Sequence, residues 1–139
     1  MSEGPVVIQR TVEWPDTDAS GHYHHSAVLR WVEAAEAVLH ERLELPDLVA
    51  RLPRVHYEVD YVARLWFRDR VQVKFSVADV GTTSVRYEFT VTRGEEVAAR
   101  GVMVCVYSEP HRHESTTTPW PEWMAQALRR ANASNDGSG

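Results

Sequence analysis

The sequence has one cysteine, one lysine and no long apolar run. The single cysteine, Cys105, excludes an intrachain disulfide and any zinc site built from several cysteines. No run of apolar residues approaches the roughly 18 needed to span a bilayer, and no basic stretch followed by an apolar one opens the chain. We therefore expect a cytoplasmic protein that does not interact with membranes.

Positive charge is sparse and scattered. The chain has 15 basic residues, 14 of them arginine, against 20 acidic residues, and its net charge is -5. Binding to a phosphate backbone needs a concentrated cationic face, so we expect no nucleic-acid partner. The run Arg64, Arg68 and Arg70 or the pair Arg51 and Arg54 could hold a small anion, although solvated arginines are the commoner finding.

The length and composition fit one globular domain. A chain of 139 residues matches the usual domain size of about 100–150 residues. Its 43% hydrophobic and 25% charged residues favour neither a disordered nor a membrane class. We predict a single domain over residues 1–131 and a disordered C-terminal tail over residues 132–139.

Hydrophobic periodicity predicts five strands. Segments rich in β-branched residues or with alternating apolar residues lie at Val6–Glu13, Val55–Ala63, Val71–Asp79, Ser84–Thr92 and Val97–Tyr107. Short connections that contain Gly81 and Gly94 predict that the last three form an antiparallel meander. The last strand is apolar on both faces, so it is either central in the sheet or buried at an interface.

One long helix is predicted between the first two strands. Apolar residues recur at spacings of three and four, namely Val28, Trp31, Val32, Ala35, Val38, Leu39 and Leu43. The helix should begin near His25 or Ser26, with Ser26 as its N-cap, and end before Pro46. Its charged residues, Glu33, Glu36, Glu41 and Arg42, predict a solvated flank.

Smaller elements complete the predicted fold. Asp47–Pro53 should form a short helical turn or loop, and a polar loop with His111 and His113 should precede a small helix within Pro119–Ala131. The fold class is therefore α+β, with a long helix across a five-stranded antiparallel sheet and a short C-terminal helix. The uncovered sheet edges and the apolar last strand lead us to expect at least a dimer.

The densest group of chemically useful side chains lies between Asp16 and His25, just before the long helix. A carboxylate ahead of a helix N-terminus can attack a carbonyl or take a proton from water. The unpaired N–H groups of the first turn can polarise that carbonyl. These groups together could form an acyl-transfer site. Alternatively, Asp16 and Asp18 cap a turn in which Gly21 takes a positive φ.

Metal binding and a serine triad are weaker alternatives. His22, His24 and His25 lie too close together in sequence to form a usual tetrahedral zinc site without help from Asp18 or from His111 and His113. We expect hydrogen-bonding histidines, no metal and no cofactor. A triad that uses Ser26 as nucleophile lacks the Gly-x-Ser-x-Gly elbow.

A family resemblance favours the acyl-transfer interpretation. The run Asp16-Thr17-Asp18-Ala19-Ser20-Gly21, followed by His25 and Leu29-Arg30-Trp31, resembles the signature of the 4-hydroxybenzoyl-CoA thioesterase family, whose members adopt the hotdog fold. Weaker likenesses occur at Tyr61–Asp69, Arg93-Gly94 with Val97-Ala98, and Pro119-Trp120-Pro121. The resemblance thus covers about Val7 to Leu128, and it implies an acyl-CoA thioesterase.

The resemblance also implies roles for particular residues. Asp18 matches the family's catalytic aspartate, as a nucleophile or as a base toward water, and His25 matches a histidine near the active site. The backbone N–H near His24 or His25 would polarise the thioester carbonyl. The substrate-binding residues would be Trp14, Gly21, His22, His24, Arg64 and Arg68, with the two arginines near the nucleotide phosphates.

Substrate and assembly follow from the same resemblance. We expect an acyl thioester of coenzyme A or of an acyl-carrier protein, hydrolysed by a homodimer that assembles into a homotetramer. Ser20, His24 and Ala27 replace a frequent glycine, an aromatic residue and an asparagine of the family, which leaves the acyl group open. The alternatives are a hydratase or dehydratase acting on a hydroxyacyl thioester, a non-catalytic acyl-binding module, or Glu33 or Glu36 as the catalytic acid.

Overall fold

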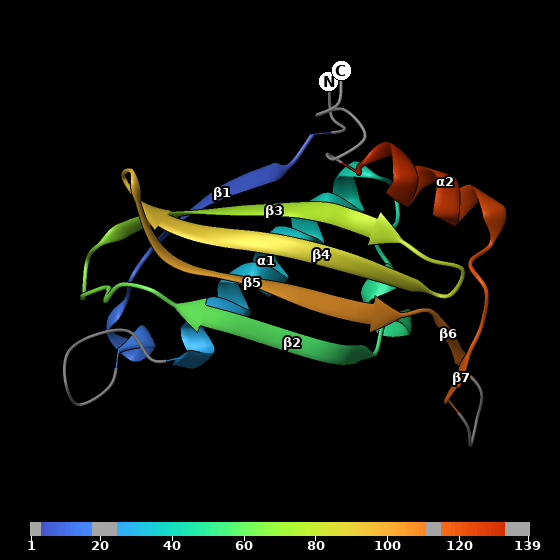
Figure 1. Ribbon diagram of the computed structural model, residues 1–139, viewed down its shortest axis with the longest axis horizontal. Helices are drawn as coiled ribbons and strands as arrows, with labels where there is room; N and C mark the ends of the chain where they lie inside the picture. Colours follow the sequence, from blue (N-terminus) through green and yellow to red (C-terminus); the bar gives the residue numbers. More distant parts are fainter. Residues whose placement is uncertain (1–3, 18–24, 111–114, 133–139) are drawn as a thin grey trace.

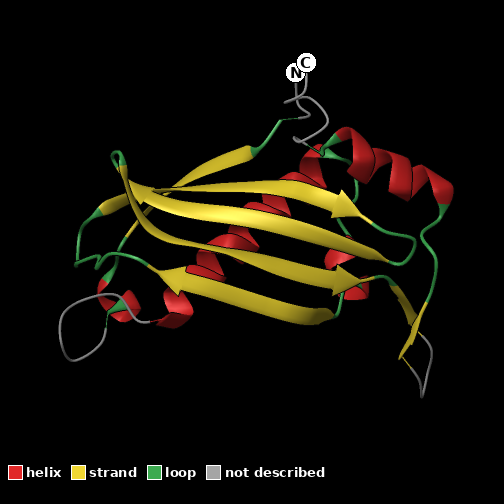
Figure 2. Cartoon of the chain, in the orientation of Figure 1, coloured by secondary structure: helices red, strands yellow, loops and turns green. Residues whose placement is uncertain are grey.

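The computed structural model describes residues 4–17, 25–110 and 115–132, with His25, Pro110, Ser115 and Thr116 described by their backbone alone. One antiparallel sheet forms a layer, and a long helix runs diagonally across one of its faces (Figure 1). A shorter helix lies at one corner of the sheet (Figure 2). None of the described helices is long and apolar enough to cross a membrane.

The sheet contains the five predicted strands. They are β1 (Val6–Thr11), β2 (Arg54–Tyr61), β3 (Arg70–Val80), β4 (Ser84–Arg93) and β5 (Glu96–Val106). Their order is β1-β3-β4-β5-β2, and all neighbours are antiparallel. The predicted meander of β3, β4 and β5 is confirmed. Strand β5 lies between β4 and β2, so the first of the two positions predicted for it, central in the sheet, is confirmed.

The core lies between the sheet and the long helix α1 (His25–Arg42). Alternate residues of β3 and β4 are buried on the face toward α1, namely Val71, Val73, Phe75, Val77, Val85, Tyr87, Phe89 and Val91. The register pairs Phe75 with Phe89 and Val73 with Val91 across the two strands. Burial of each such side chain contributes about 1.5–3 kcal/mol to folding, so the alternation read from the sequence fixes which face carries the helix.

Helix α1 matches the prediction in length and differs in two details. It has 18 residues, and its buried side chains recur at the expected spacing, namely Ala27, Val28, Trp31, Val32, Ala35 and Leu39. Val38 is 37% exposed, so its assignment to the buried face was wrong. Ser26 is not the N-cap, because the helix already begins at His25 and Ser26 lies in its first turn.

Helix α1 ends at Arg42, four residues before Pro46, in a backbone capping motif. Glu44 has a positive φ of 61°, its N–H donates to the Glu41 carbonyl at 3.0 Å, and the Leu45 N–H donates to the His40 carbonyl at 2.7 Å. This is the Schellman pattern, which satisfies the last carbonyls of a helix and usually places glycine where Glu44 stands.

The remaining elements are short. They are the 3-10 turns η1 (Trp14–Asp16) and η2 (Leu48–Arg51), the strands β6 (Ser108–Pro110) and β7 (Ser115–Thr117), and helix α2 (Glu122–Arg130). The predicted polar loop after Ser108 is thus partly a two-stranded ribbon. Asn132, which we placed in the disordered tail, is instead 8% exposed and bridges Val77. Residues 133–139 lie outside the described residues.

Candidate active site

The segment that leads to the predicted catalytic aspartate is held in place by Asp16. Its carboxylate accepts a hydrogen bond from the Glu13 backbone N–H at 2.8 Å and forms an ion pair with Arg30 of α1. Asp16 is 6% exposed, and these contacts tie η1 to the helix. Asp16 therefore has a structural role, which leaves Asp18 as the other carboxylate of the motif.

Most of the predicted catalytic stretch lies outside the described residues. This applies to Asp18, Gly21, His22 and His24, and to the side chain of His25. His25, described by its backbone, is the first residue of α1. The helix N-terminus therefore begins seven residues after Asp18, and its first-turn N–H groups follow directly on this stretch. The catalytic and binding roles of these five residues stay predictions.

Two of the predicted binding residues lie together. Trp14 in η1 is 66% exposed, and its ring meets the ring of Phe67 edge-on, with 5.5 Å between the centroids. The Arg68 guanidinium lies 5.1 Å from the centroid of the same Phe67 ring. Trp14, Phe67 and Arg68 form a cluster that we call the aromatic platform. Arg64, the third predicted binding residue whose side chain is described, is exposed in the same connection between β2 and β3.

The aromatic platform stands on a tight turn. The Asp69 backbone N–H donates to the Trp66 carbonyl at 3.0 Å, and the Asp69 carboxylate accepts hydrogen bonds from the Trp66 N–H at 2.9 Å and from Arg93 at 2.7 Å. The turn is joined to β1's continuation by two bonds of 2.8 Å, from the Arg68 N–H to the Val12 carbonyl and from the Val12 N–H to the Asp69 carbonyl. Asp69 therefore has a structural role.

The structure divides the predicted anion clusters. Arg70 begins β3 and lines a different groove together with Arg10 and Arg30. Arg51 lies 4.0 Å from the Glu109 carboxylate, and Arg54 is bound to glutamates, as shown below. Arg54 is therefore not available for an anion together with Arg51, because its guanidinium is already bound to protein carboxylates.

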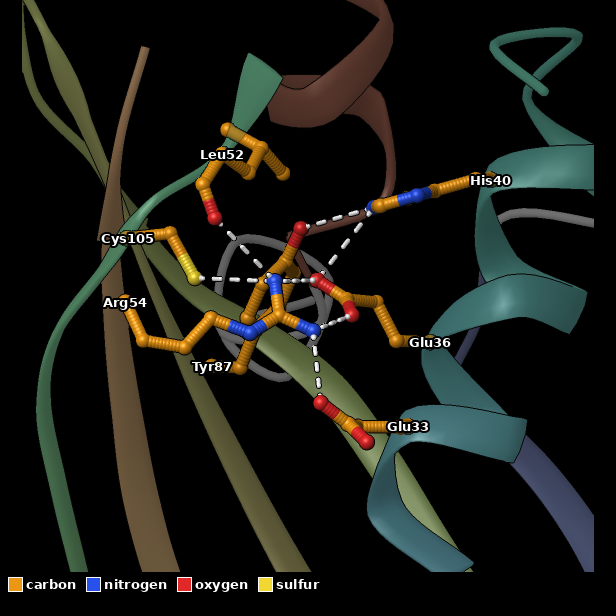
Figure 3. Close-up of polar contacts among 7 residues, drawn as sticks. All are labelled: Glu33, Glu36, His40, Leu52, Arg54, Tyr87 and Cys105. Atoms are coloured by element: carbon orange, nitrogen blue, oxygen red, sulfur yellow. Dashed lines mark hydrogen bonds and ion pairs between the residues drawn. The ribbon is translucent and has the colours of Figure 1, made fainter. Parts of the chain in front are cut away.

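Glu36 is buried, and the prediction of a solvated flank was wrong for this residue. It is 1% exposed and faces Arg54 at the start of β2 (Figure 3). The guanidinium binds it twice, with Nη2 to Oε1 at 2.5 Å and Nη1 to Oε2 at 3.2 Å. Arg54 also reaches Glu33 at 3.4 Å. A bidentate pair of this kind is geometrically specific, and it joins the middle of α1 to the edge strand β2.

The network continues into the core. His40 Nε2 lies 2.9 Å from the Tyr87 hydroxyl and 3.7 Å from the Glu36 carboxylate, and Arg54 Nη1 lies 3.6 Å from the Cys105 sulfur. We refer to Glu33, Glu36, His40, Arg54, Tyr87 and Cys105 as the buried network. Sequence reasoning missed it, because its members come from α1, β2, β4 and β5.

Burial sets the charges in the buried network. Burial raises the pKa of Glu36, and the neighbouring Arg54 charge opposes that rise. Burial, followed by the Arg54 charge, lowers the pKa of His40 from 6.5 to about 4, so its contact with Glu36 is made by a neutral imidazole. Burial also raises the pKa of the Cys105 thiol to about 11. Near pH 7 the network therefore places the ion pairs of Arg54 with Glu36 and Glu33 beside a neutral imidazole and a neutral thiol.

His40 should make the fold sensitive to acid. Because its pKa is lower in the folded chain, its contribution is complete above pH 6.5 and is lost as the pH falls toward about 4. The loss should reach about 3 kcal/mol of unfolding free energy. Urea denaturation across this pH range gives the free energy of unfolding as a function of pH. The loss is measured as the difference between the slope of this dependence in the wild type and in His40→Gln.

The matched control is His56→Gln, since His56 is an exposed histidine on β2 that pairs with Glu58. In His56→Gln the free energy of unfolding should change between pH 6.5 and about pH 4 as it does in the wild type. Glu36, whose pKa is raised, acts in the opposite direction, and comparing variants that both retain Glu36 removes its contribution. A slope that is unchanged in His40→Gln would contradict the assignment.

Metal binding receives no support from the described part of the chain, in which no group of three or more histidine, cysteine, aspartate or glutamate residues could hold an ion. The histidines that we considered for zinc, at positions 22, 24, 25, 111 and 113, have no described side chains. The expectation of no metal therefore stays a prediction.

Comparisons with known proteins agree with the geometry. The family model of the Thioesterase-like superfamily matches residues 12–128. The 1,4-dihydroxy-2-naphthoyl-CoA hydrolase of Synechococcus elongatus is 23% identical over 84% of this chain and 93% of its own length. A thioesterase from Thermus thermophilus, solved with coenzyme A and Zn, is 28% identical, with a TM-score of 0.83 over 95% of this chain and 97% of that chain.

A third comparison concerns the fold alone. A 1,4-dihydroxy-2-naphthoyl-CoA thioesterase from Synechocystis is 20% identical, with a TM-score of 0.80 over 91% of this chain and 96% of that one. The predicted hotdog fold is thereby confirmed. The match of the family model spans well over half of the sequence, and the chain belongs to the Thioesterase-like superfamily.

Proposed function

We propose that the protein hydrolyses acyl-CoA thioesters, with Asp18 as the catalytic residue. The observation that carries this proposal is the start of α1 at His25, directly after the aspartate-containing motif, in a chain of the Thioesterase-like superfamily. The helix N-terminus would supply backbone N–H groups for a developing oxyanion, and the motif would supply the carboxylate of Asp18, seven residues before the helix in sequence.

Two routes satisfy the chemistry. As a general base, Asp18 takes a proton from water while the water oxygen adds to the thioester carbonyl. The tetrahedral oxyanion then collapses, the C–S bond breaks, and the thiolate leaves with the proton from Asp18. As a nucleophile, Asp18 forms an anhydride and expels the thiolate, and water then hydrolyses the anhydride and protonates the thiol. In both routes the N–H groups near His24 and His25 receive the oxyanion, and the His25 side chain assists.

The acyl group that we propose is aromatic. Two of the relatives compared above are named as acting on 1,4-dihydroxy-2-naphthoyl-CoA, and this name supports an aryl-CoA substrate. Gly21, His22 and His24 would contact the substrate from the catalytic stretch, and Trp14, Arg64 and Arg68 from the surface beside it. An acyl-carrier-protein substrate remains the second choice, and the experiments below separate the two.

We also propose that β2 pairs with β2 of a second copy. This strand has eight residues and lies at an edge of the described sheet, and an edge strand is a template for pairing with a strand of another chain. Val55 and Tyr61 on this strand are 57% and 46% exposed, which is unusual for a free edge. A homodimer formed here could assemble further into the expected homotetramer.

A panel assay tests the function. Purified protein is mixed with aryl-CoA, short-chain acyl-CoA and carrier-bound acyl thioesters, and the free thiol is measured. We expect the thiol to be released faster from aryl-CoA substrates than from short-chain acyl-CoA or carrier-bound substrates. Conversion of a hydroxyacyl thioester without thiol release would indicate the hydratase alternative. Tight CoA binding without turnover on any substrate would indicate a binding module.

A further inference from the structure

The aromatic platform is an unusual surface for a small domain. Trp14 and Phe67 are 66% and 41% exposed, yet the edge-on contact between their rings holds both in place. The Arg68 guanidinium lies against the Phe67 ring. Among the described residues, no carboxylate pairs with Arg68, since the adjacent Asp69 is bound to Arg93. The platform therefore offers aromatic faces and an unneutralised cation side by side.

The backbone at Arg68 indicates that this arrangement is imposed. Arg68 has a φ of 77°, in the left-handed region where glycine is the usual residue. Its N–H bond to Val12 and the bonds of the following Asp69 keep it there. Strained positions of this kind concentrate at binding and catalytic sites. Glycine would relieve the strain, so an arginine at this position has a conformational cost.

The chemistry of the platform suits a nucleotide. Aromatic faces stack on the flat faces of nucleobases without a sequence requirement, and guanidinium groups bind phosphates with matched geometry. A purely apolar ligand would not use Arg68, and a simple phosphate would not use Trp14 and Phe67. Arg64, exposed in the same connection, adds a second cation to this side of the molecule.

The position of the platform relative to Asp18 is also suitable. Trp14 precedes Asp18 by four residues, a length of chain that spans at most about 14 Å. In an acyl-CoA the reacting thioester and the nucleotide are at opposite ends of the pantetheine arm. A nucleotide site should therefore lie on the open surface, within reach of that arm from the catalytic stretch, and the exposed aromatic platform, whose Trp14 is four residues from Asp18, is suited to this.

We propose that Trp14, Phe67 and Arg68 bind the adenine and phosphates of coenzyme A. This inference rests on the proposed function and narrows it: a carrier-protein substrate has the pantetheine arm without the adenosine, so the platform selects free CoA esters. Asp69 and Arg93 are positioning residues, since they hold the turn and do not face the ligand.

Arg68→Gly gives the sharpest test. Glycine fits the positive φ, so the variant should be at least as stable to urea as the wild type, and it should lose only the guanidinium. We expect it to bind CoA about tenfold more weakly and to show a similar rise in KM for an aryl-CoA substrate. Binding of pantetheine and kcat/KM for the matching aryl-pantetheine thioester should not change. Trp14→Ala and Phe67→Leu should have the same selective effect.

Two variants on α2 provide controls. Trp123→Ala removes another exposed tryptophan, and Arg130→Ala removes another exposed arginine, and both should bind CoA as the wild type does. Equal losses on the CoA and pantetheine compounds, or no loss on either, would overturn the inference. So would a change of oligomeric state in Trp14→Ala with CoA binding unaltered. CoA binding is measured by calorimetry without turnover, so failure of the proposed hydrolysis is recognised separately.

Discussion

Asp18→Asn should lower kcat for thioester hydrolysis by about 100- to 10,000-fold, the range typical of a lost general acid or base. The amide is almost isosteric with the carboxylate, but it neither takes a proton from water nor attacks a carbonyl. CoA binding should remain near the wild-type value, because the residues proposed for the nucleotide, Trp14, Phe67 and Arg68, lie elsewhere on the chain. Thiol release under substrate saturation, together with calorimetric CoA binding, measures the two effects.

Asp16→Asn is the matched control. Its amide oxygen can still accept the Glu13 N–H bond, and it loses only the ion pair with Arg30, whose side chain is 52% exposed and therefore screened by solvent. Activity per folded molecule should stay within a few-fold of the wild type. If Asp18→Asn retained full activity, the catalytic carboxylate would have to lie elsewhere. Glu33, with a side chain that is 47% exposed, would then be the next candidate, tested as Glu33→Gln.

Local patterns in the sequence were sufficient to predict the sheet and the long helix. The alternation of Val71, Val73 and Phe75 with polar residues has one physical solution, a strand with one buried face. The spacing of Val28, Trp31 and Val32 likewise fits a helix with one buried stripe. In both cases the residues that carry the signal are neighbours along the chain, so no knowledge of distant partners was needed.

Features that depend on distant partners could not be predicted. Glu36 looks like any charged residue on an amphipathic helix, and its burial depends on Arg54, which is 18 residues further along the chain. Phe67 gave no signal, because its importance arises from Trp14 on a separate segment. The sequence therefore predicts a catalytic stretch through a local motif, but it could not reveal which side chains from distant segments pack together.

Arg54→Met should lower the free energy of unfolding by about 3–5 kcal/mol, the cost typical of removing one partner from a buried ion pair. The substitution preserves much of the apolar volume and leaves Glu36 buried at 1% exposure without its cation. Arg51→Met is the control, since its contact with Glu109 is exposed on both sides at 4.0 Å and should contribute less than about 1 kcal/mol. Urea denaturation of both variants measures the difference.

The pH dependence of Arg54→Met identifies the cause of its instability. Burial already raises the pKa of Glu36, and Arg54 is the main influence that opposes the rise, so loss of Arg54 should raise the pKa further. A carboxyl group with a raised pKa in the folded state binds a proton that the unfolded chain releases. Its contribution is therefore most favourable below its ordinary pKa of 4.5 and falls as the pH rises toward the folded-state pKa. The deficit of Arg54→Met should thus be smaller at about pH 5 than at about pH 7.

The double variant Arg54→Met/Glu36→Gln completes the argument. Glutamine removes the charge and keeps nearly the same shape, so the double variant should recover part of the stability lost in Arg54→Met. Both variants lack Arg54 and keep His40, so the difference between them isolates the ionisation of Glu36. That difference should grow as the pH rises. Two results would contradict this argument: a difference that is independent of pH, or a loss of stability in Arg54→Met no larger than that in Arg51→Met. In either case the ion pair would not be what holds β2 to α1, and packing of the apolar part of the arginine side chain would have to provide the stability.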